Sequence, residues 1–229
     1  MPKQGTLKIK MIKLIIFDLD GTLLNTLEDL ADACNHALMK CGCPIREQEE
    51  YNMLVGRGID NLFRGALPKD RRSEDMVQQM RAYFLPYYNE HKCDRTIPYT
   101  GITEMLDKLT EMGLRFAVAS NKYQEGTEML VRKYFPGYSF AKVLGQREGK
   151  PIKPDPGIVY EAMEAIPGIS KDEVAYCGDS DVDMMTGLGA GVRTIGVTWG
   201  FRTREELEAY SPDAIVDIPS EIMEQINFR

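Results

Sequence analysis

The stretch that decides the fold is KLIIFDLDGT, residues Lys13–Thr22, in which an apolar run ends at two aspartates separated by one leucine. A short apolar run of this kind predicts a buried strand. Two carboxylates about 5 Å apart repel each other by roughly 3 kcal/mol at an effective dielectric constant of about 20. We therefore expect a cation or a shared proton beside Asp18 and Asp20.

The composition is that of a soluble globular protein. The chain has 229 residues, of which 43% are hydrophobic and 28% charged, and its net charge of −7 gives no electrostatic reason to bind nucleic acid. Five cysteines without a C-x-x-C pattern, and only two histidines, favour a reduced cytoplasmic protein over a disulfide framework or a zinc site. We expect no membrane span and no signal peptide, and we expect residues 1–10 to be a flexible N-terminal extension.

Two patterns divide the chain. Apolar residues at helical spacing predict a helix over residues 25–42, and helical or turn-like segments continue to about residue 92. Further on, strands and helices alternate, with strands expected at 114–120, 139–145, 173–179, 192–200 and 214–217, and helices at 101–112, 124–134, 156–166 and 182–189. The pattern predicts an α/β fold with a Rossmann-like parallel sheet core, formed by residues 11–24 and 95–229, and an all-helical domain over residues 25–94 inserted after the first strand.

Polar residues follow several of the expected strands. Besides Asp18 and Asp20, these are Ser120, Asn121, Lys122, Asp179, Asp181 and Asp183. Because ligand sites of open parallel sheets lie at the carboxyl ends of the strands, these side chains are expected to meet. Five carboxylates in one place call for a hard divalent cation such as Mg²⁺. Lys153 in GKPIKPDPG can point its charge at them, and Lys150 is a competitor for that position.

Four motifs, FDLDGT, VASNK, KPDP and GDSDVD, occur in the order found in the haloacid dehalogenase-like hydrolase superfamily, which the chain resembles over essentially its whole length. Within that superfamily it is most similar to the phosphoglycolate phosphatase-like group. This narrower likeness depends on the helical cap, the lysine of ASNK, KPDP and the segment GVTWGFRTREEL.

The resemblance implies a phosphatase that uses Mg²⁺ and an aspartyl-phosphate intermediate to hydrolyse a small phosphorylated metabolite. It implies Asp18 as the nucleophile and Asp20 as general acid and then base, and we expect the repulsion between these two carboxylates to push their pKa values apart. Ser120 and the backbone amide of Asn121 would donate to the phosphoryl oxygens, and Lys153 would offset the negative charge.

The same resemblance implies the metal ligands. These are the Asp18 carboxylate, the backbone carbonyl of Asp20 and Asp179, with Asp183 as a further ligand or as a residue behind the ligands. Asp181 is the least certain of the acids.

The choice of substrate is expected to lie in the helical insertion. Arg57 stands between two glycines and could present its guanidinium to an anion, as could Arg64 and Lys122. Thr22 and Asn121 complete the substrate-binding candidates. Asn25 stands where many relatives have an acidic residue, and its side chain can cap the following helix.

Other interpretations stay open at this point. Asp20 argues against a haloacid dehalogenase proper and against a phosphonatase, but a β-phosphoglucomutase-like phosphotransferase would keep both aspartates. A receiver-like signalling domain and a catalytically idle binding protein are alternatives from other classes. The chain could be a monomer or a homodimer.

Overall fold

A computed structural model describes residues 11–226, and a six-stranded parallel sheet lies at its centre. The N-terminal extension expected at residues 1–10 lies outside the described residues. The sheet has the order β5-β4-β1-β6-β7-β8. Its strands are β1 (Leu14–Phe17), β4 (Arg115–Tyr123), β5 (Phe140–Gln146), β6 (Val174–Gly178), β7 (Arg193–Val197) and β8 (Ala214–Val216). The α/β fold class expected from the alternating pattern is confirmed.

The first strand lies in the middle of the sheet and is buried on both faces. Its side chains alternate, so that Ile15 and Phe17 pack on one face and Leu14 and Ile16 on the other. The first face is covered by α4 (Ile102–Glu111), α5 (Gln124–Tyr134) and α9 (Ile222–Ile226), and the second by α6 (Gly157–Met163) and α7 (Asp181–Ala190). A strand covered on both sides has to be apolar throughout, as LIIF is.

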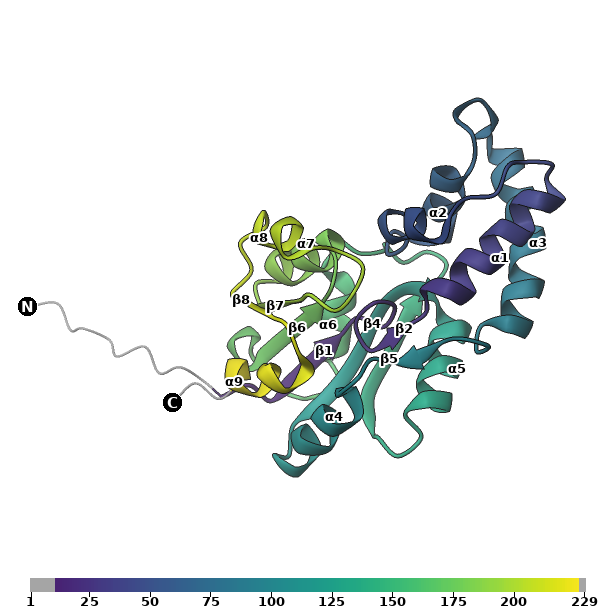
Figure 1. Cartoon of the computed structure of the whole chain (residues 1–229). Helices are drawn as coiled ribbons and strands as arrows, with labels where there is room; N and C mark the ends of the chain where they lie inside the picture. Colours follow the sequence, from purple (N-terminus) through teal and green to yellow (C-terminus); the bar gives the residue numbers. More distant parts are fainter. Residues whose placement is uncertain (1–10, 227–229) are drawn as a thin grey trace, which may run out of the picture.

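Residues 26–96 form a helical region with a hydrophobic core of its own. It contains α1 (Leu27–Lys40), α2 (Ile59–Ala66), α3 (Glu74–His91) and two short 3₁₀ helices, Gln48–Met53 and Lys69–Arg71. Figure 1 shows these three helices together in a lobe beside the sheet. Tyr51, Phe63 and Phe84 are among the fully buried side chains of this second core.

The helical region is connected to the part of the molecule that contains the sheet through two neighbouring chain segments. There β2 (Leu24–Asn25) pairs antiparallel with β3 (Ile97–Pro98). Asp29 in the first turn of α1 reinforces this junction, because its carboxylate accepts hydrogen bonds from the backbone amides of Arg95 and Thr96 and from the Thr96 hydroxyl. Asn25 accepts a bond from the amide of Leu27, at the start of α1.

Several element boundaries differ from the sequence expectation. The strand expected at 114–120 continues to Tyr123, which pairs with Gln146 of β5. Helix α6 ends at Met163, before Ile166–Gly168, where a proline and a glycine favour a turn. The short helix α8 (Arg204–Glu208) was not expected, although Thr203 and Glu206 form a capping box that marks its start.

Within the described residues, no helix is both long and apolar enough to cross a membrane.

Candidate active site

The carboxyl ends of β1, β4 and β6 bring the expected polar residues together. Asp18 follows β1, Ser120 and Asn121 lie in the last part of β4, and Asp179 follows β6. Gly21 has a φ of +90°, and a Cβ atom there would collide with the Asp179 carboxylate. The glycine of FDLDGT thus allows the loop after β1 to approach the loop after β6.

Lys153 supplies the cation that the paired aspartates of the first strand called for. Its Nζ lies 2.8 Å from Asp18 Oδ1 and 2.7 Å from Asp183 Oδ1, and it donates a hydrogen bond to the Tyr176 hydroxyl at 3.1 Å. Lys153 is only 2% exposed, whereas its competitor Lys150 is exposed to solvent. Lys153 is therefore the lysine that the structure brings to the acidic cluster.

Asp179 and Asp183 are held in place by different neighbours. Asp179 accepts hydrogen bonds from the Thr22 hydroxyl at 2.9 Å and from the Phe201 amide at 2.8 Å. Asp183 accepts from the hydroxyl and the amide of Ser180, at 2.5 Å and 3.1 Å, in the capping box of α7. Thr22 was expected to bind substrate, but its hydroxyl is directed to Asp179, so this geometry favours a positioning role.

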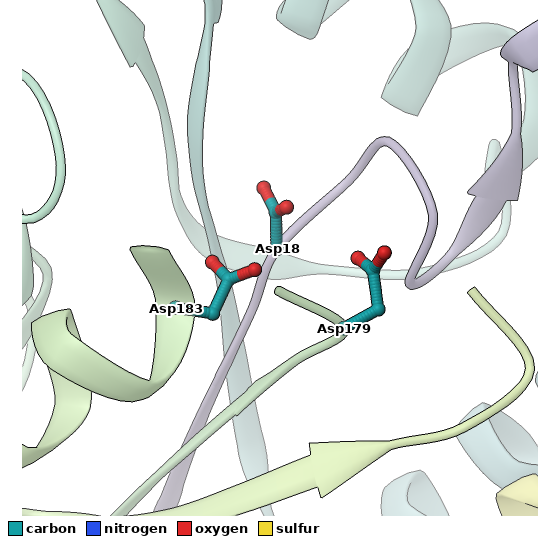
Figure 2. A group of neighbouring side chains, drawn as sticks. All are labelled: Asp18, Asp179 and Asp183. Carbon is teal, nitrogen blue, oxygen red and sulfur yellow. The ribbon is translucent and has the colours of Figure 1, made fainter. Parts of the chain in front are cut away.

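Asp18, Asp179 and Asp183 form a cluster suited to a hard divalent cation. Each offers a carboxylate oxygen, these oxygens lie within 4.8 Å of one another, and Figure 2 shows the three side chains pointing toward one space. When all three carboxyls are ionised, their three negative charges and the positive charge of Lys153 leave two negative charges in a buried site. Oxygen ligands with that residual charge fit Mg²⁺.

The excess of negative charge in the cluster also shifts the pKa values of Asp179, Asp18 and Lys153. Burial, together with Asp183, raises the pKa of Asp179 to about 7. Burial, followed by Asp183, raises the pKa of Asp18, and Lys153 acts in the opposite direction. Burial disfavours the charged form of Lys153, but Asp18 and Asp183 outweigh it and raise the pKa of Lys153 well above its usual value.

Asp20 has a cationic partner of its own. Lys122 Nζ lies 3.0 Å from both carboxylate oxygens of Asp20, and the Thr26 hydroxyl donates to Asp20 at 2.8 Å. The cation expected beside the paired aspartates is thus present at both of them, and the carboxylates that raise the pKa of Asp18 are Asp183 and Asp179. Lys122, expected at the substrate, instead pairs with Asp20.

Asn121 links the two parts of the molecule. Its side-chain amide donates to the carbonyl oxygens of Gly56 and Lys153, at 2.9 Å and 3.0 Å, and its Oδ1 accepts from the Lys153 amide at 2.8 Å. One side chain thereby fixes the backbone around the buried lysine to the turn that carries Arg57.

The two arginines proposed from the sequence as anion ligands have acidic partners in the protein. Arg57 forms an ion pair with Asp181, and Arg64 pairs with Glu74 on the exposed side of the helical region. Arg202, which the sequence did not single out, is 4% exposed, lies 3.6 Å from Asp181 and donates to the carbonyl oxygens of Asn52, Met53 and Val55. Asp181 therefore lies between two arginines at the contact of the helical region with the core.

A cavity of about 50 Å³ lies over the aspartates. The core lines it with Asp18, Asp20, Ser120, Asn121, Lys122 and Tyr123, and the helical region with Leu30, Val55, Gly56, Gly58, Ile59, Leu62, Phe84 and Tyr88. No pattern in the sequence distinguishes Tyr88 as a lining residue, because α3 contains three tyrosines and only the packing of that helix shows which one reaches the cavity.

Residues 15–197 match the haloacid dehalogenase-like hydrolase family. The chain belongs to this family, as its fold and the order of its four motifs indicated, and it is therefore a hydrolase.

Within this family, the chain is similar to several proteins that are named phosphoglycolate phosphatases. The chain is 31% identical over 220 residues to the phosphoglycolate phosphatase of Vibrio parahaemolyticus, covering 94% of this chain and 96% of that one. It is 31% identical over 211 residues to the phosphoglycolate phosphatase of Haemophilus influenzae, covering 90% and 94%. A solved structure of a predicted phosphoglycolate phosphatase from Haemophilus somnus has a TM-score of 0.87 at 29% identity, covering 95% of this chain and 99% of that one. The likeness to the phosphoglycolate phosphatase-like group is confirmed.

Proposed function

We propose that this protein is a Mg²⁺-dependent phosphatase that hydrolyses a small phosphate monoester of the phosphoglycolate type through an aspartyl phosphate. The observation that carries the proposal is the buried Asp18 carboxylate on the wall of the cavity, with Lys153 at 2.8 Å and two further carboxylates around the same point. The names of the curated relatives support this choice of substrate class.

The residues divide the reaction into two steps. In the first, an Asp18 oxygen attacks phosphorus, the bond from phosphorus to the alcohol oxygen breaks, and Asp20 gives its proton to that oxygen. In the second, Asp20 takes a proton from water as the water oxygen attacks phosphorus, and the bond to Asp18 breaks. Asp20 lines the same cavity as Asp18, as both steps require.

The groups around Asp18 stabilise charge during transfer. Ser120 and Asn121 line the cavity, so that the Ser120 hydroxyl and the backbone amide of Asn121 can donate to the phosphoryl oxygens, while Lys153 offsets charge on Asp18 and on the transferring group. Both Asp183 oxygens already accept hydrogen bonds from neighbouring side chains. We therefore assign Asp183 mainly to the orientation of Lys153.

Mg²⁺, when bound by Asp18, Asp179 and the Asp20 carbonyl, would supply the remaining positive charge for a dianionic phosphate. The residual charge of two negative units among the three aspartates and Lys153 supports this assignment.

We interpret the helical region as a cap over the active site, with residues 25–94 as its extent. Its contribution to the cavity lining and the single crossing at β2 and β3 support that role, because a lid joined by one short ladder can open without disturbing the sheet.

The test is phosphate release from small phosphorylated metabolites by wild-type protein and by Asp18→Asn, with and without Mg²⁺. We expect wild-type turnover only with Mg²⁺, and a loss of about 10³-fold or more in Asp18→Asn with an unchanged circular dichroism spectrum. Asp32→Asn, which changes an exposed carboxylate on α1, is the matched control. Substantial turnover by Asp18→Asn would remove the nucleophile assignment, and isomerisation of a sugar 1-phosphate in the presence of a bisphosphate would instead support a phosphotransferase.

A further inference from the structure

Tyr88 lines the cavity over the aspartates, and its hydroxyl is buried without a hydrogen-bond partner. Tyr88 belongs to α3, is 1% exposed and lines the cavity that contains Asp18 and Asp20. Among the residues that the structure describes, none donates to its hydroxyl or accepts from it. A buried hydroxyl without a partner costs the folded state free energy, so such groups need an explanation.

The ring of Tyr88 is held firmly, so the hydroxyl has a defined position. Phe84 stacks on it with ring centroids 5.1 Å apart, and Lys122 Nζ lies 4.9 Å from the ring centroid. The same ammonium group pairs with both oxygens of Asp20. Tyr88 is therefore close to the carboxyl group that is proposed to protonate the leaving alcohol.

Apart from Tyr88, the helical region lines this cavity with glycines and apolar side chains. Its other lining side chains are apolar, namely Leu30, Val55, Ile59, Leu62 and Phe84, and the Arg57 guanidinium is paired with Asp181. A phenol is un-ionised at neutral pH and can donate one hydrogen bond. Tyr88 thus contributes a hydrogen-bond donor without a partner to a wall whose other side chains from the helical region are apolar.

We propose that the Tyr88 hydroxyl donates a hydrogen bond to an oxygen on the alcohol part of the substrate. The enzyme would then select short phosphate esters whose leaving group carries an acceptor oxygen, such as a carboxylate, close to the ester bond. This inference rests on the proposed phosphatase function. A site built to hydrogen-bond a substrate discriminates strongly against an analogue that lacks the partner, because the buried group is then left unpaired.

The experiment compares two substrates of similar shape on wild-type protein and Tyr88→Phe. Phosphoglycolate carries the acceptor, and isobutyl phosphate has an isopropyl group of similar shape in place of the carboxylate. We expect Tyr88→Phe to lower kcat/KM for phosphoglycolate by about 10- to 100-fold, the size of a lost hydrogen bond to a charged group, and to leave that for isobutyl phosphate within about twofold.

A stability measurement separates recognition from a structural role. Tyr88→Phe removes a hydroxyl that has no partner, so its melting temperature is expected to equal or exceed that of wild type. Tyr51→Phe is the matched control: Tyr51 is a fully buried tyrosine of the helical region whose hydroxyl donates to Asn35 at 2.7 Å and which does not line the cavity. Tyr51→Phe is expected to melt at a lower temperature and to keep the substrate preference of wild type.

Three results would count against the inference. Equal losses on both substrates would indicate that Tyr88 shapes the cavity without recognising the acceptor, and no loss on either would show that the hydroxyl does not touch the substrate. A lower melting temperature of Tyr88→Phe would indicate a structural partner such as a buried water. Failure of wild-type protein to release phosphate from either ester, or from a generic aryl phosphate, would instead overturn the proposed function.

Discussion

At the scale of single residues, the acidic cluster depends on Lys153 for its charge balance. Replacing Lys153 by methionine keeps most of the side-chain volume but leaves Asp18 and Asp183 without their shared ammonium partner. Breaking a buried ion pair from one side typically costs about 3–5 kcal/mol. We expect Lys153→Met to lose most activity and to lower the metal-free stability to urea, while Lys150→Met, at an exposed position, leaves both unchanged. Equal effects of the two variants would contradict the assignment.

The titration of Asp179 makes a second residue-scale prediction, on metal affinity. The pKa of Asp179 is raised to about 7, so below that pH the carboxyl is mostly protonated and must release its proton to bind a cation. Mg²⁺ affinity should therefore rise with pH through about 7, by about tenfold per pH unit for each carboxyl that must lose a proton, and the raised pKa of Asp18 adds to this slope. Calorimetric titration between pH 5.5 and 8.5 measures this directly. An affinity that is constant over that range would contradict a protonated Asp179.

Among the secondary-structure elements, the contact that matters most joins the helical region to the start of α7. Arg202 donates to three carbonyl oxygens just before Gly56, and Asp181 in the first turn of α7 lies beside Arg202 and pairs with Arg57. These bonds hold the turn of residues 56–58 over the cavity. Because Arg202, Asp181 and Arg57 do not line the cavity, they should act on closure and little on the chemical step.

Loss of this contact should be visible as an opening of the helical region. We expect Arg202→Met to raise KM by about tenfold, to change kcat less, and to speed amide hydrogen exchange in residues 52–58 while the sheet stays protected. Arg64→Met removes an arginine of the same region whose partner is the exposed Glu74, and it serves as the control. Faster exchange without any change in KM would show that the contact is structural only.

The sequence predicted the elements of the sheet and the residues at its carboxyl end because both depend on local patterns. Short apolar runs mark the strands, and FDLDGT and GDSDVD are each a continuous stretch of a few residues. What it missed depends on packing: Arg202 contacts residues about 150 positions earlier in the chain, at Asn52. Likewise, no spacing rule reveals that Asp20 pairs with Lys122, or which tyrosine of α3 faces the cavity.

For the whole molecule, the decisive feature is that two separate hydrophobic cores meet at one active site. The sheet and its covering helices form clusters that share no buried residue with the cluster of α1, α2 and α3. Asp18, Asp179, Asp183 and Lys153 all belong to the sheet side, whereas the helical region supplies mainly the apolar lining. Metal binding should thus depend on the packing of the sheet side alone, whereas the choice of substrate should depend on the sheet side and on the helical region.

This division leads to the last prediction, on Phe63→Ala in the core of the helical region. Phe63 is fully buried and packs against Phe84, so its loss should destabilise the helical region by about 3–5 kcal/mol. Hydrogen exchange should accelerate in α1, α2 and α3 but little in β1, β4 and β6, and calorimetry should find Mg²⁺ affinity within about twofold of wild type. The turnover of phosphoglycolate should fall, because Tyr88 and the apolar wall are no longer held over the aspartates.

Ile15→Ala, an equally buried change on the sheet side, is the comparison variant. It should weaken Mg²⁺ binding and speed hydrogen exchange in the sheet more than in the helical region, since Asp18 directly follows β1. If both variants lost Mg²⁺ affinity together, the two parts would unfold as a single cooperative unit and the helical region could not move as a separate lid.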